Sequence, residues 1–491
     1  MRPLLYTFFL SAACLSSHAQ TERLQLPAIT GTPAQFTPHN NTLYFTADNG
    51  SGDKLWQIAS STAQPQMLDS LFQYSSSTTP WRRMVILNDI LYFCGRNDSV
   101  GEELFAYDGS NAPYPVADIR QGSASASPEG LMVLNGIIYF SATTVAYGRE
   151  LCSYDPIKRK VMMEWDTEPG SASSNPYALQ AVGNQVCFVA QTQASGRELN
   201  VYDPVKKELN CYEIVPGASG SNPMNLTVHN GKLYFSAQDL VYGNELFVYN
   251  GSSAPLRLTD IAPGNAHSLQ AAACGIGNLG SRIYFAGSTG QVYESMLCSY
   301  DTVTRTAHTD TLRTNGNADI RGFAVYNNRL YFFAKDNSNT SWLWRTDGIR
   351  APEKIVPMHA EVVGNRVPMM VHNNLLYFSG YEPGATTSVY RFDDSKLTNA
   401  VSRISFTADV QLYPNPATDA IHISVNTPET ANMQIVLTDA AGRQVARRAA
   451  STQPGTNTFN ISTAQLPAGV YYMGLYDAGG ILQHSSRVTK L

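Results

Sequence analysis

The stretch NGIIYFSATTVAYGRELCSYDP, Asn135 to Pro156, decides the fold because the chain repeats it. NGKLYFSAQDLVYGNELFVYNG begins at Asn230, and related segments begin at Asn88 and Gly183. A period of 40–50 residues is typical of propellers and helical arrays. Aligned on its apolar-aromatic-Phe triplet, the unit occurs eight times, 46 to 50 residues apart, at Phe45, Phe93, Phe140, Phe188, Phe235, Phe285, Phe332 and Phe378.

The pattern inside each unit selects a β-propeller. Each copy holds four short β-branched and aromatic segments bounded by Gly, Asn, Asp or Pro, with no helical period. The first two segments are joined by pairs such as Asn135-Gly136 and Asn327-Asn328, which tolerate the positive φ of a two-residue hairpin. We therefore predict an all-β fold with an eight-bladed propeller over residues 20–405, and seven blades as the alternative. Tyr/Phe pairs should fill the space between blades.

Both ends of the repeat region bear on ring closure. Residues 22–30, ERLQLPAIT, resemble a fourth strand placed before the first complete unit. We predict that this segment pairs into the last blade and closes the ring. Residues 402–406, SRISF, compete for the same place.

Composition points to an exported protein. Charged residues make up 15% of 491, below the roughly 25% of average proteins. The net charge is −5 without a basic run, which argues against nucleic-acid or anionic-membrane surfaces. Residues 1–19 read as a signal peptide, with Arg2, an apolar core and small residues before Gln20. A lipoprotein site at Cys14 is the alternative, although Ser11 stands where Leu is expected.

The mature chain is not predicted to span a membrane, because no other apolar run reaches the ~20 residues that a span requires. Its six cysteines allow many disulfide pairings, and buried thiols on strands are an equal alternative. They are Cys94, Cys152, Cys187, Cys211, Cys274 and Cys298.

The third strand of the repeat resembles a known bacterial motif. Segments such as WLWRTDG at Trp342 and ELFAYDG at Glu103 are similar to the secreted E-L-W-x-x-D-G-T repeat, over nearly all of residues 40–395. Most copies depart from it, with Phe, Cys or Asn in place of Trp. The resemblance implies a secreted β-propeller and carries no shared chemistry.

Residues 406–491 form a different module. Alternating segments with Gly-containing turns predict a small antiparallel β-sandwich. The module closely resembles the type A C-terminal sorting domain of the Bacteroidetes type IX secretion system, which implies the secretion machinery as a partner. It also implies passage across the outer membrane, removal of the module, and release or attachment at the cell surface. The matching residues include Tyr413, Pro414, Asn415, Pro416, Gly442, Gly469 and Tyr471.

A Gly-x-Glu-Leu motif recurs where the loop between the second and third strands ends. We expect each glutamate to accept backbone N–H groups from the Gly/Ser-rich connection to the next blade, for example residues 168–176. The functional alternative is a polar rim that binds sugar or peptide. Its residues would be Glu103, Glu150, Glu198, Glu245, Tyr147 and Tyr242.

Other candidate sites are weak. His39, His229 and His372 precede the hairpin turns of separate blades, and we interpret them as structural neighbours of those turns. DNGSGD, Asp48 to Asp53, loosely resembles a calcium loop. It occurs once and lacks a downstream bidentate glutamate, so a plain loop is preferred and no cofactor is predicted. Nucleotide-binding, zinc-protease and serine-hydrolase motifs are absent.

We therefore predict a secreted or cell-surface propeller that acts as a non-catalytic binding, adhesion or scaffold module for a polysaccharide or a protein. A glycan-degrading hydrolase or lyase is the alternative. A glycosidase needs two carboxylates about 5–10 Å apart at one centre, which glutamates spread around a ring do not provide. Function should lie where the copies differ, in the loops between second and third strands, which include residues 143–149, 191–197, 335–341 and 381–387.

Overall fold

A computed structural model shows two compact units, Met1–Lys396 and Leu397–Leu491. The structure describes residues 21–24, 26, 29, 31–68, 73–74, 84–264, 269, 275–288, 295–314, 316–360, 369–381, 387–396, 410–427, 431–439, 444–477 and 482–491. The predicted signal peptide, Cys14, Cys274, residues 402–406 and Gly442 lie outside these residues.

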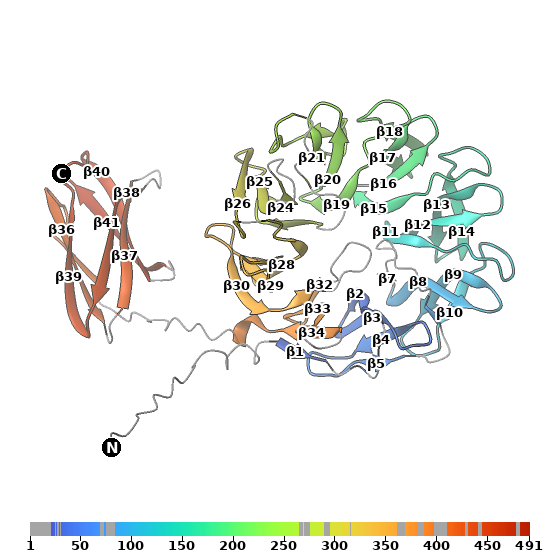
Figure 1. The fold of residues 1–491 in the computed structure, drawn as a ribbon, viewed down its shortest axis with the longest axis horizontal. Coiled ribbons are helices and arrows are strands. Elements are labelled where there is room, and N and C mark those ends of the chain that lie inside the picture. The colour runs from blue at the N-terminus through green and yellow to red at the C-terminus, as the bar shows by residue number, and fades with distance from the viewer. Residues whose placement is uncertain are drawn as a thin grey trace, which may run out of the picture. The chain divides into compact units, whose positions relative to one another are not determined.

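The first unit is all-β, as predicted, and its antiparallel sheets follow one another round a ring (Figure 1). Its strands are β1 (Thr21–Arg23), β2 (Ala34–His39), β3 (Thr42–Asp48), β4 (Asp53–Ile58), β5 (Gln66–Met67), β6 (Gln73–Tyr74), β7 (Val85–Leu87), β8 (Ile90–Asn97), β9 (Gly101–Tyr107), β10 (Tyr114–Ala117), β11 (Glu129–Leu134), β12 (Ile137–Thr144), β13 (Gly148–Asp155), β14 (Lys160–Trp165), β15 (Tyr177–Val182), β16 (Gln185–Thr192), β17 (Gly196–Asp203), β18 (Glu208–Tyr212), β19 (Met224–His229), β20 (Lys232–Asp239), β21 (Gly243–Tyr249), β22 (Leu256–Arg257), β23 (Ile276–Leu279), β24 (Arg282–Gly287), β25 (Met296–Asp301), β26 (Thr306–Asp310), β27 (Arg321–Tyr326), β28 (Arg329–Lys335), β29 (Ser341–Thr346), β30 (Glu353–Pro357), β31 (His359–Ala360), β32 (Met369–His372), β33 (Leu375–Tyr381) and β34 (Ser388–Phe392). A short 3₁₀ turn, η1 (Asp394–Lys396), follows the last strand.

Each sheet is a meander of the kind that the repeat predicts. In the sheet β11–β14, for example, each strand pairs with the next, and the sheets β2–β5, β15–β18, β19–β22, β23–β26 and β27–β30 repeat this order. The sheet around β8 and β9 carries an additional short strand, and the last sheet takes β1 from the N-terminal segment. The part of the chain that the structure describes contains eight antiparallel sheets in this unit, of four or five strands each. The propeller prediction is confirmed. The number of blades stays a prediction, because segments beside several sheets lie outside the described residues.

The hairpin turns have the backbone conformation that their residues favour. Both central residues have positive φ at Asn135–Gly136, with angles of 51° and 77°. Asn327–Asn328 behaves in the same way, with 49° and 55°. These turns keep the twist of the two strands they join, so each hairpin stays in register.

Apolar and aromatic side chains fill the space between neighbouring sheets. One cluster joins Tyr139 and Leu151 of one sheet to Leu179 and Phe188 of the next. These side chains are at most 4% exposed. Because such clusters recur between sheets around the ring, the Tyr/Phe filling is confirmed and no sheet stands alone.

The ring closes where the two ends of the unit meet. Strand β1 pairs antiparallel with β34, with Thr21 opposite Phe392 and Arg23 opposite Tyr390. The Arg391 guanidinium donates to both carboxylate oxygens of Glu22 at 2.7 and 2.9 Å. The predicted pairing of the N-terminal segment into the last sheet is therefore confirmed.

The second unit consists of two antiparallel sheets around one apolar core that includes Ile423 and Met473. Asn415 of the Tyr413–Pro416 motif bridges to the last strand: its side chain donates to the Arg487 carbonyl at 2.8 Å and accepts from the Thr489 N–H at 2.9 Å. The strands are β35 (Val410–Tyr413), β36 (Ala420–Thr427) and β39 (Gly455–Ser462) in one sheet, and β37 (Ala431–Asp439), β38 (Gln444–Thr452), β40 (Gly469–Asp477) and β41 (Leu482–Lys490) in the other.

Candidate functional site

The four repeated glutamates lie inside the protein with 0% of their surface exposed. Glu150 accepts the backbone N–H groups of Thr167 at 3.0 Å and Ser174 at 2.7 Å, and also the Ser174 hydroxyl at 2.5 Å. Thr167 and Ser174 lie at the two ends of the loop between β14 and β15. One carboxylate thus holds together the connection that leads to the next sheet.

The same arrangement recurs in neighbouring sheets. The bonds are those from Ile119, Arg120 and Ala126 N–H to Glu103, from Val215 and Ser221 N–H to Glu198, and from the Thr259 hydroxyl to Glu245. The predicted backbone bonds are confirmed for Glu103, Glu150 and Glu198. A ligand would reach these carboxylates only by displacing those bonds.

The glycine of the Gly-x-Glu-Leu motif allows the connection to the next sheet to lie close against the start of the third strand. Gly148 and Gly196 have φ of 64° and 65°, where L side chains are strained. A Cβ on Gly196 would lie 2.6 Å from the Ala218 carbonyl oxygen, in the loop between β18 and β19. The motif is therefore a packing device that sets loop against strand.

Protonation of Glu103 makes a testable contribution to stability. Burial raises the pKa of Glu103 to about 7, and the Asp118 carboxylate adds to the rise, although three backbone donors oppose it. Since this pKa lies above the ordinary value of 4.5, the folded state holds the proton more tightly than the unfolded chain. Its stabilising contribution is complete below pH about 4.5 and is lost as the pH rises through about 7.

We expect Glu103→Gln to remove this pH dependence. The free energy of unfolding should fall less between about pH 5 and pH 8 in the variant than in the natural chain. Urea unfolding monitored by tryptophan fluorescence isolates the propeller, because all five tryptophans precede residue 345. Glu208→Gln, at an exposed carboxylate, is the control. If the free energy of unfolding of Glu103→Gln changes with pH as steeply as that of the natural chain, Glu103 is not the source of the pH dependence.

The two tyrosines predicted beside the rim differ in environment. Tyr147 is 39% exposed at the tip of the β12–β13 loop. Tyr242 stacks under the Arg257 guanidinium, whose carbon lies 3.5 Å from the ring centroid. Whether either tyrosine contacts a ligand stays a prediction.

A cleft of about 630 Å³ opens among the loops that the glutamates hold. Two of its walls are the connections β14–β15 and β18–β19, and the third is the β16–β17 loop. This loop, residues 191–197, belongs to the set in which the repeats differ. The lining residues are Glu168, Ala172, Ser173, Gln191, Thr192, Gln193, Gly196, Arg197, Ala218, Ser219 and Asn222.

The cleft is polar and its walls are hydrogen-bonded to one another. The Gln193 N–H donates to Glu168 at 2.8 Å, and the Asn222 N–H donates to the Arg197 carbonyl at 3.0 Å. Its lining residues supply three amide side chains and several hydroxyls, but only one carboxylate and no His, Cys or aromatic ring. Such a set can bind a hydroxyl-rich ligand, whereas acid–base catalysis by paired carboxylates has no second carboxylate among these residues.

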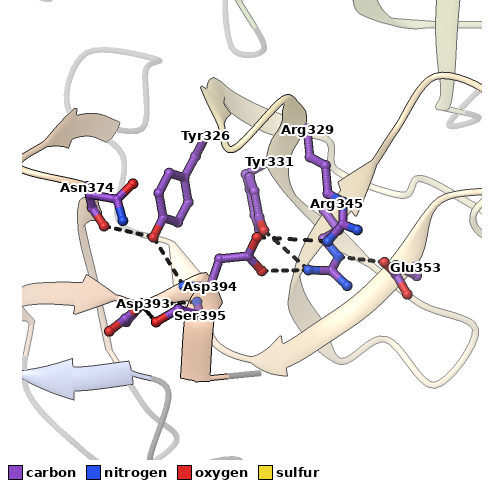
Figure 2. Close-up of polar contacts among 9 residues, drawn as sticks. All are labelled: Tyr326, Arg329, Tyr331, Arg345, Glu353, Asn374, Asp393, Asp394 and Ser395. Atoms are coloured by element: carbon purple, nitrogen blue, oxygen red, sulfur yellow. Dashed lines mark hydrogen bonds and ion pairs between the residues drawn. The ribbon is translucent and has the colours of Figure 1, made fainter. Parts of the chain in front are cut away.

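A second polar cluster lies between the sheet β27–β30 and η1, which follows the last sheet (Figure 2). Arg345 donates to Asp394 at 2.6 Å, and both side chains are 8% exposed. Asp394 also lies 3.8 Å from Arg329, and its N–H donates to the Tyr326 hydroxyl at 3.2 Å. The cluster attaches the last element of the unit to the neighbouring sheet, so we assign it to packing of these two consecutive sheets.

His229 and the DNGSGD loop, which the sequence also singled out, form hydrogen bonds at turns. His229 lies 2.9 Å from the Gly280 carbonyl oxygen of the next hairpin turn, as expected of a turn neighbour. Asp48 accepts the N–H groups of Gly50 and Gly52 within the DNGSGD loop. No cluster of three metal-binding side chains occurs among the described residues. Calcium binding at Asp48 and Asp53 stays untested.

The described cysteines include buried thiols on strands. Burial raises the pKa of Cys152 and Cys187 to about 12, so these thiols stay protonated and unreactive. They behave as small apolar side chains between the sheets.

The family comparison identifies the second unit. Residues 411–486 match the secretion system C-terminal sorting domain. They are a sorting domain. This domain directs the protein through type IX secretion to the cell surface or the extracellular space, and implies contact with that machinery. In the described part of the chain, no helix is both long and apolar enough to cross a membrane. The signal peptide and the resemblance to the E-L-W-x-x-D-G-T repeat stay predictions.

Solved structures resemble the chain only distantly, and no curated protein matches it. A puromycin hydrolase is 13% identical, with a TM-score of 0.44 over 72% of this chain; the chain spans 59% of that protein's length. The extracellular domain of a putative one-component system from B. thetaiotaomicron is 9% identical and has a TM-score of 0.32. The match covers 96% of this chain and 99% of that domain. The β-propeller domain of the Trilobed protease from Pyrococcus furiosus is 9% identical, covers 64% and 94%, and has a TM-score of 0.38.

Proposed function

We propose that the propeller is a non-catalytic binding module that the sorting domain delivers to the cell exterior, where it binds a polysaccharide. The observation that carries this proposal is the cleft of about 630 Å³ between the β14–β15, β16–β17 and β18–β19 loops. Its size and its amide and hydroxyl lining suit several sugar rings. Release of the protein or its attachment to the cell surface after removal of the sorting domain belongs to the same proposal.

Rigid walls support binding rather than catalysis. Glu150 and Glu198 hold two of the three loops by buried hydrogen bonds, so the cleft is formed before a ligand arrives. A pre-formed site loses little conformational entropy on binding. Glu168 is the one carboxylate in the lining, and it already accepts the Gln193 N–H.

The test is retention of the mature full-length protein on immobilised polysaccharides and extracellular-matrix proteins, with released sugar measured in the same wells. We expect retention on a polysaccharide without product, and at least a several-fold loss of affinity in Gln193→Ala. Asn210→Ala, at an exposed amide on β18 outside the cleft, is the matched control. Released product would favour the hydrolase or lyase, and retention on proteins alone would replace the polysaccharide ligand.

A further inference from the structure

Two arginines occupy the same repeat position but have different surroundings. Arg149 and Arg197 both follow the glycine of Gly-Arg-Glu-Leu, on β13 and β17. Arg149 is part-buried and donates to the Ser127 carbonyl at 2.9 Å and to the Ser141 hydroxyl at 3.4 Å. It also lies 4.0 Å from the Glu129 carboxylate. In its own sheet, Arg149 is a structural arginine.

The next repeat lacks the two side-chain partners. Tyr177 stands at the position of Glu129, and Val189 stands at the position of Ser141. Neither replacement offers a carboxylate or hydroxyl at the place where Arg149 finds one, and Tyr177 directs its own hydroxyl to the Pro223 carbonyl. The substitutions remove the side-chain carboxylate and hydroxyl that lie beside Arg149, whereas the backbone carbonyl of Ser127 has its counterpart in that of Asn175.

Arg197 instead lies exposed in the cleft. Its Nε donates to the Gln191 side-chain oxygen at 3.1 Å, which orients the guanidinium plane. Among the described residues, the two terminal nitrogens have no hydrogen-bond partner, and no carboxylate lies within ion-pair distance. Glu168 lines the same cleft without pairing with Arg197, and one of its oxygens accepts the Gln193 N–H.

A guanidinium with free terminal nitrogens forms its strongest contacts with carboxylate, sulfate or phosphate groups, which accept two parallel hydrogen bonds. The described lining offers no aromatic ring on which a neutral sugar could stack. Affinity must therefore come from hydrogen bonds and from charge. Glu168 is the one anionic side chain in the described lining. It forms no ion pair with Arg197, and its carboxylate can also accept sugar hydroxyls.

We propose that the cleft is selective for an acidic polysaccharide, and that Arg197 binds the carboxylate or sulfate group of one sugar residue. This inference rests on the proposed function and names its ligand class. The amides of Gln191, Gln193 and Asn222 then bind the neighbouring hydroxyls.

The experiment compares matched polymers on the mature full-length protein. Polygalacturonate is paired with its methyl ester, and dextran sulfate is paired with dextran, so each pair differs mainly in charge. We expect affinity for the charged member of at least one pair to exceed that for the neutral member by about tenfold or more, since a hydrogen bond to a charged group is stronger than one between neutral groups. The responding pair distinguishes carboxylate from sulfate.

Variants at Arg197 test the residue. Arg197→Gln should abolish the preference for the charged polymer, and Arg197→Lys should restore only part of it, because a lysine cannot form two parallel bonds. Arg159→Gln, at an exposed arginine in the β13–β14 turn, is the control and should bind as the natural chain does. The unfolding midpoint should be unchanged in Arg197→Gln, since the side chain is exposed.

Each alternative result has a definite meaning. Equal affinity for charged and neutral polymers overturns the acidic class and leaves the proposed function standing. A charge preference that survives Arg197→Gln overturns the role of Arg197. Immobilised polyglutamate is a further probe. If the protein binds polyglutamate and neither polysaccharide, and Arg197→Gln removes that binding, the cleft is assigned to an acidic protein. Absence of retention on any polysaccharide overturns both this inference and the proposed function.

Discussion

Asp394→Ala is expected to lower the free energy of unfolding of the propeller by about 3–5 kcal/mol. The substitution removes the buried carboxylate 2.6 Å from the Arg345 guanidinium and leaves that guanidinium, 8% exposed, with the exposed Glu353 as its remaining anion (Figure 2). A buried charge that loses its buried partner costs far more than the pair contributes, because its hydration is not restored. The loss falls where η1 joins the sheet β27–β30.

Urea unfolding followed by tryptophan fluorescence measures this effect, and Trp342 and Trp344 lie on the same strand as Arg345. Glu353→Ala is the matched control. Glu353 also pairs with Arg345 but is 58% exposed, so its loss should cost at most about 1 kcal/mol. Equal effects from the two variants would show that the Asp394 pair is not the buried connection we describe.

Replacing both members of the pair separates charge from packing. Asp394→Leu combined with Arg345→Met should be much less destabilised than Asp394→Ala alone, because no unpaired charge remains. A double variant as unstable as Asp394→Ala would instead assign the loss to packing of η1.

Gly148→Ala is expected to destabilise the propeller by about 3 kcal/mol or more. A φ of 64° costs an L residue roughly 1–2 kcal/mol, and overpacking adds about 1–3 kcal/mol. The added Cβ would lie 2.2 Å from the Ala172 carbonyl oxygen, which belongs to the β14–β15 connection. Either the β14–β15 connection or the start of β13 must move, and movement of the connection disturbs the wall of the cleft.

Gly136→Ala separates the two causes. Gly136 has a φ of 77° in the hairpin turn, but a Cβ there meets nothing within 4 Å. Its cost should therefore be the conformational part alone, about 1 kcal/mol. Chemical denaturation of both variants supplies the comparison. If Gly148→Ala and Gly136→Ala lower the free energy of unfolding equally, close packing of the β14–β15 connection on Gly148 does not explain why glycine stands there.

Much of the fold could be predicted from the sequence because its determinants are local. The hairpin residues Asn135-Gly136 define a turn by their own φ preferences, and the aromatic triplet around Phe140 marks one buried strand per repeat. A local signal repeated eight times at nearly one spacing predicts stacked sheets, without knowledge of any single contact. The sorting domain was predictable for a similar reason, since short motifs such as Tyr413–Pro416 occur in a set order.

The candidate site could be predicted only in part. The loop at residues 191–197 was expected to matter because the repeats differ there, and it does form one wall of the cleft. Glu150 and Glu198 were candidates for both structure and binding, and the folded chain confirms the predicted backbone donors around both carboxylates. Glu168 and Asn222 were not predicted as site residues, since they line the cleft from separate connections.

The sequence by itself thus determined the architecture of this protein: a repeated four-strand unit, a ring closed by its N-terminal segment, and a sorting domain. Only the tertiary structure decided which of two arginines at one repeat position is free to bind. Arg149 and Arg197 occur in the same four-residue motif, and they differ through Glu129, Ser141, Tyr177 and Val189. These four residues lie on other strands than the arginines, so whether they contact a guanidinium is set by the pairing of strands in the folded sheet.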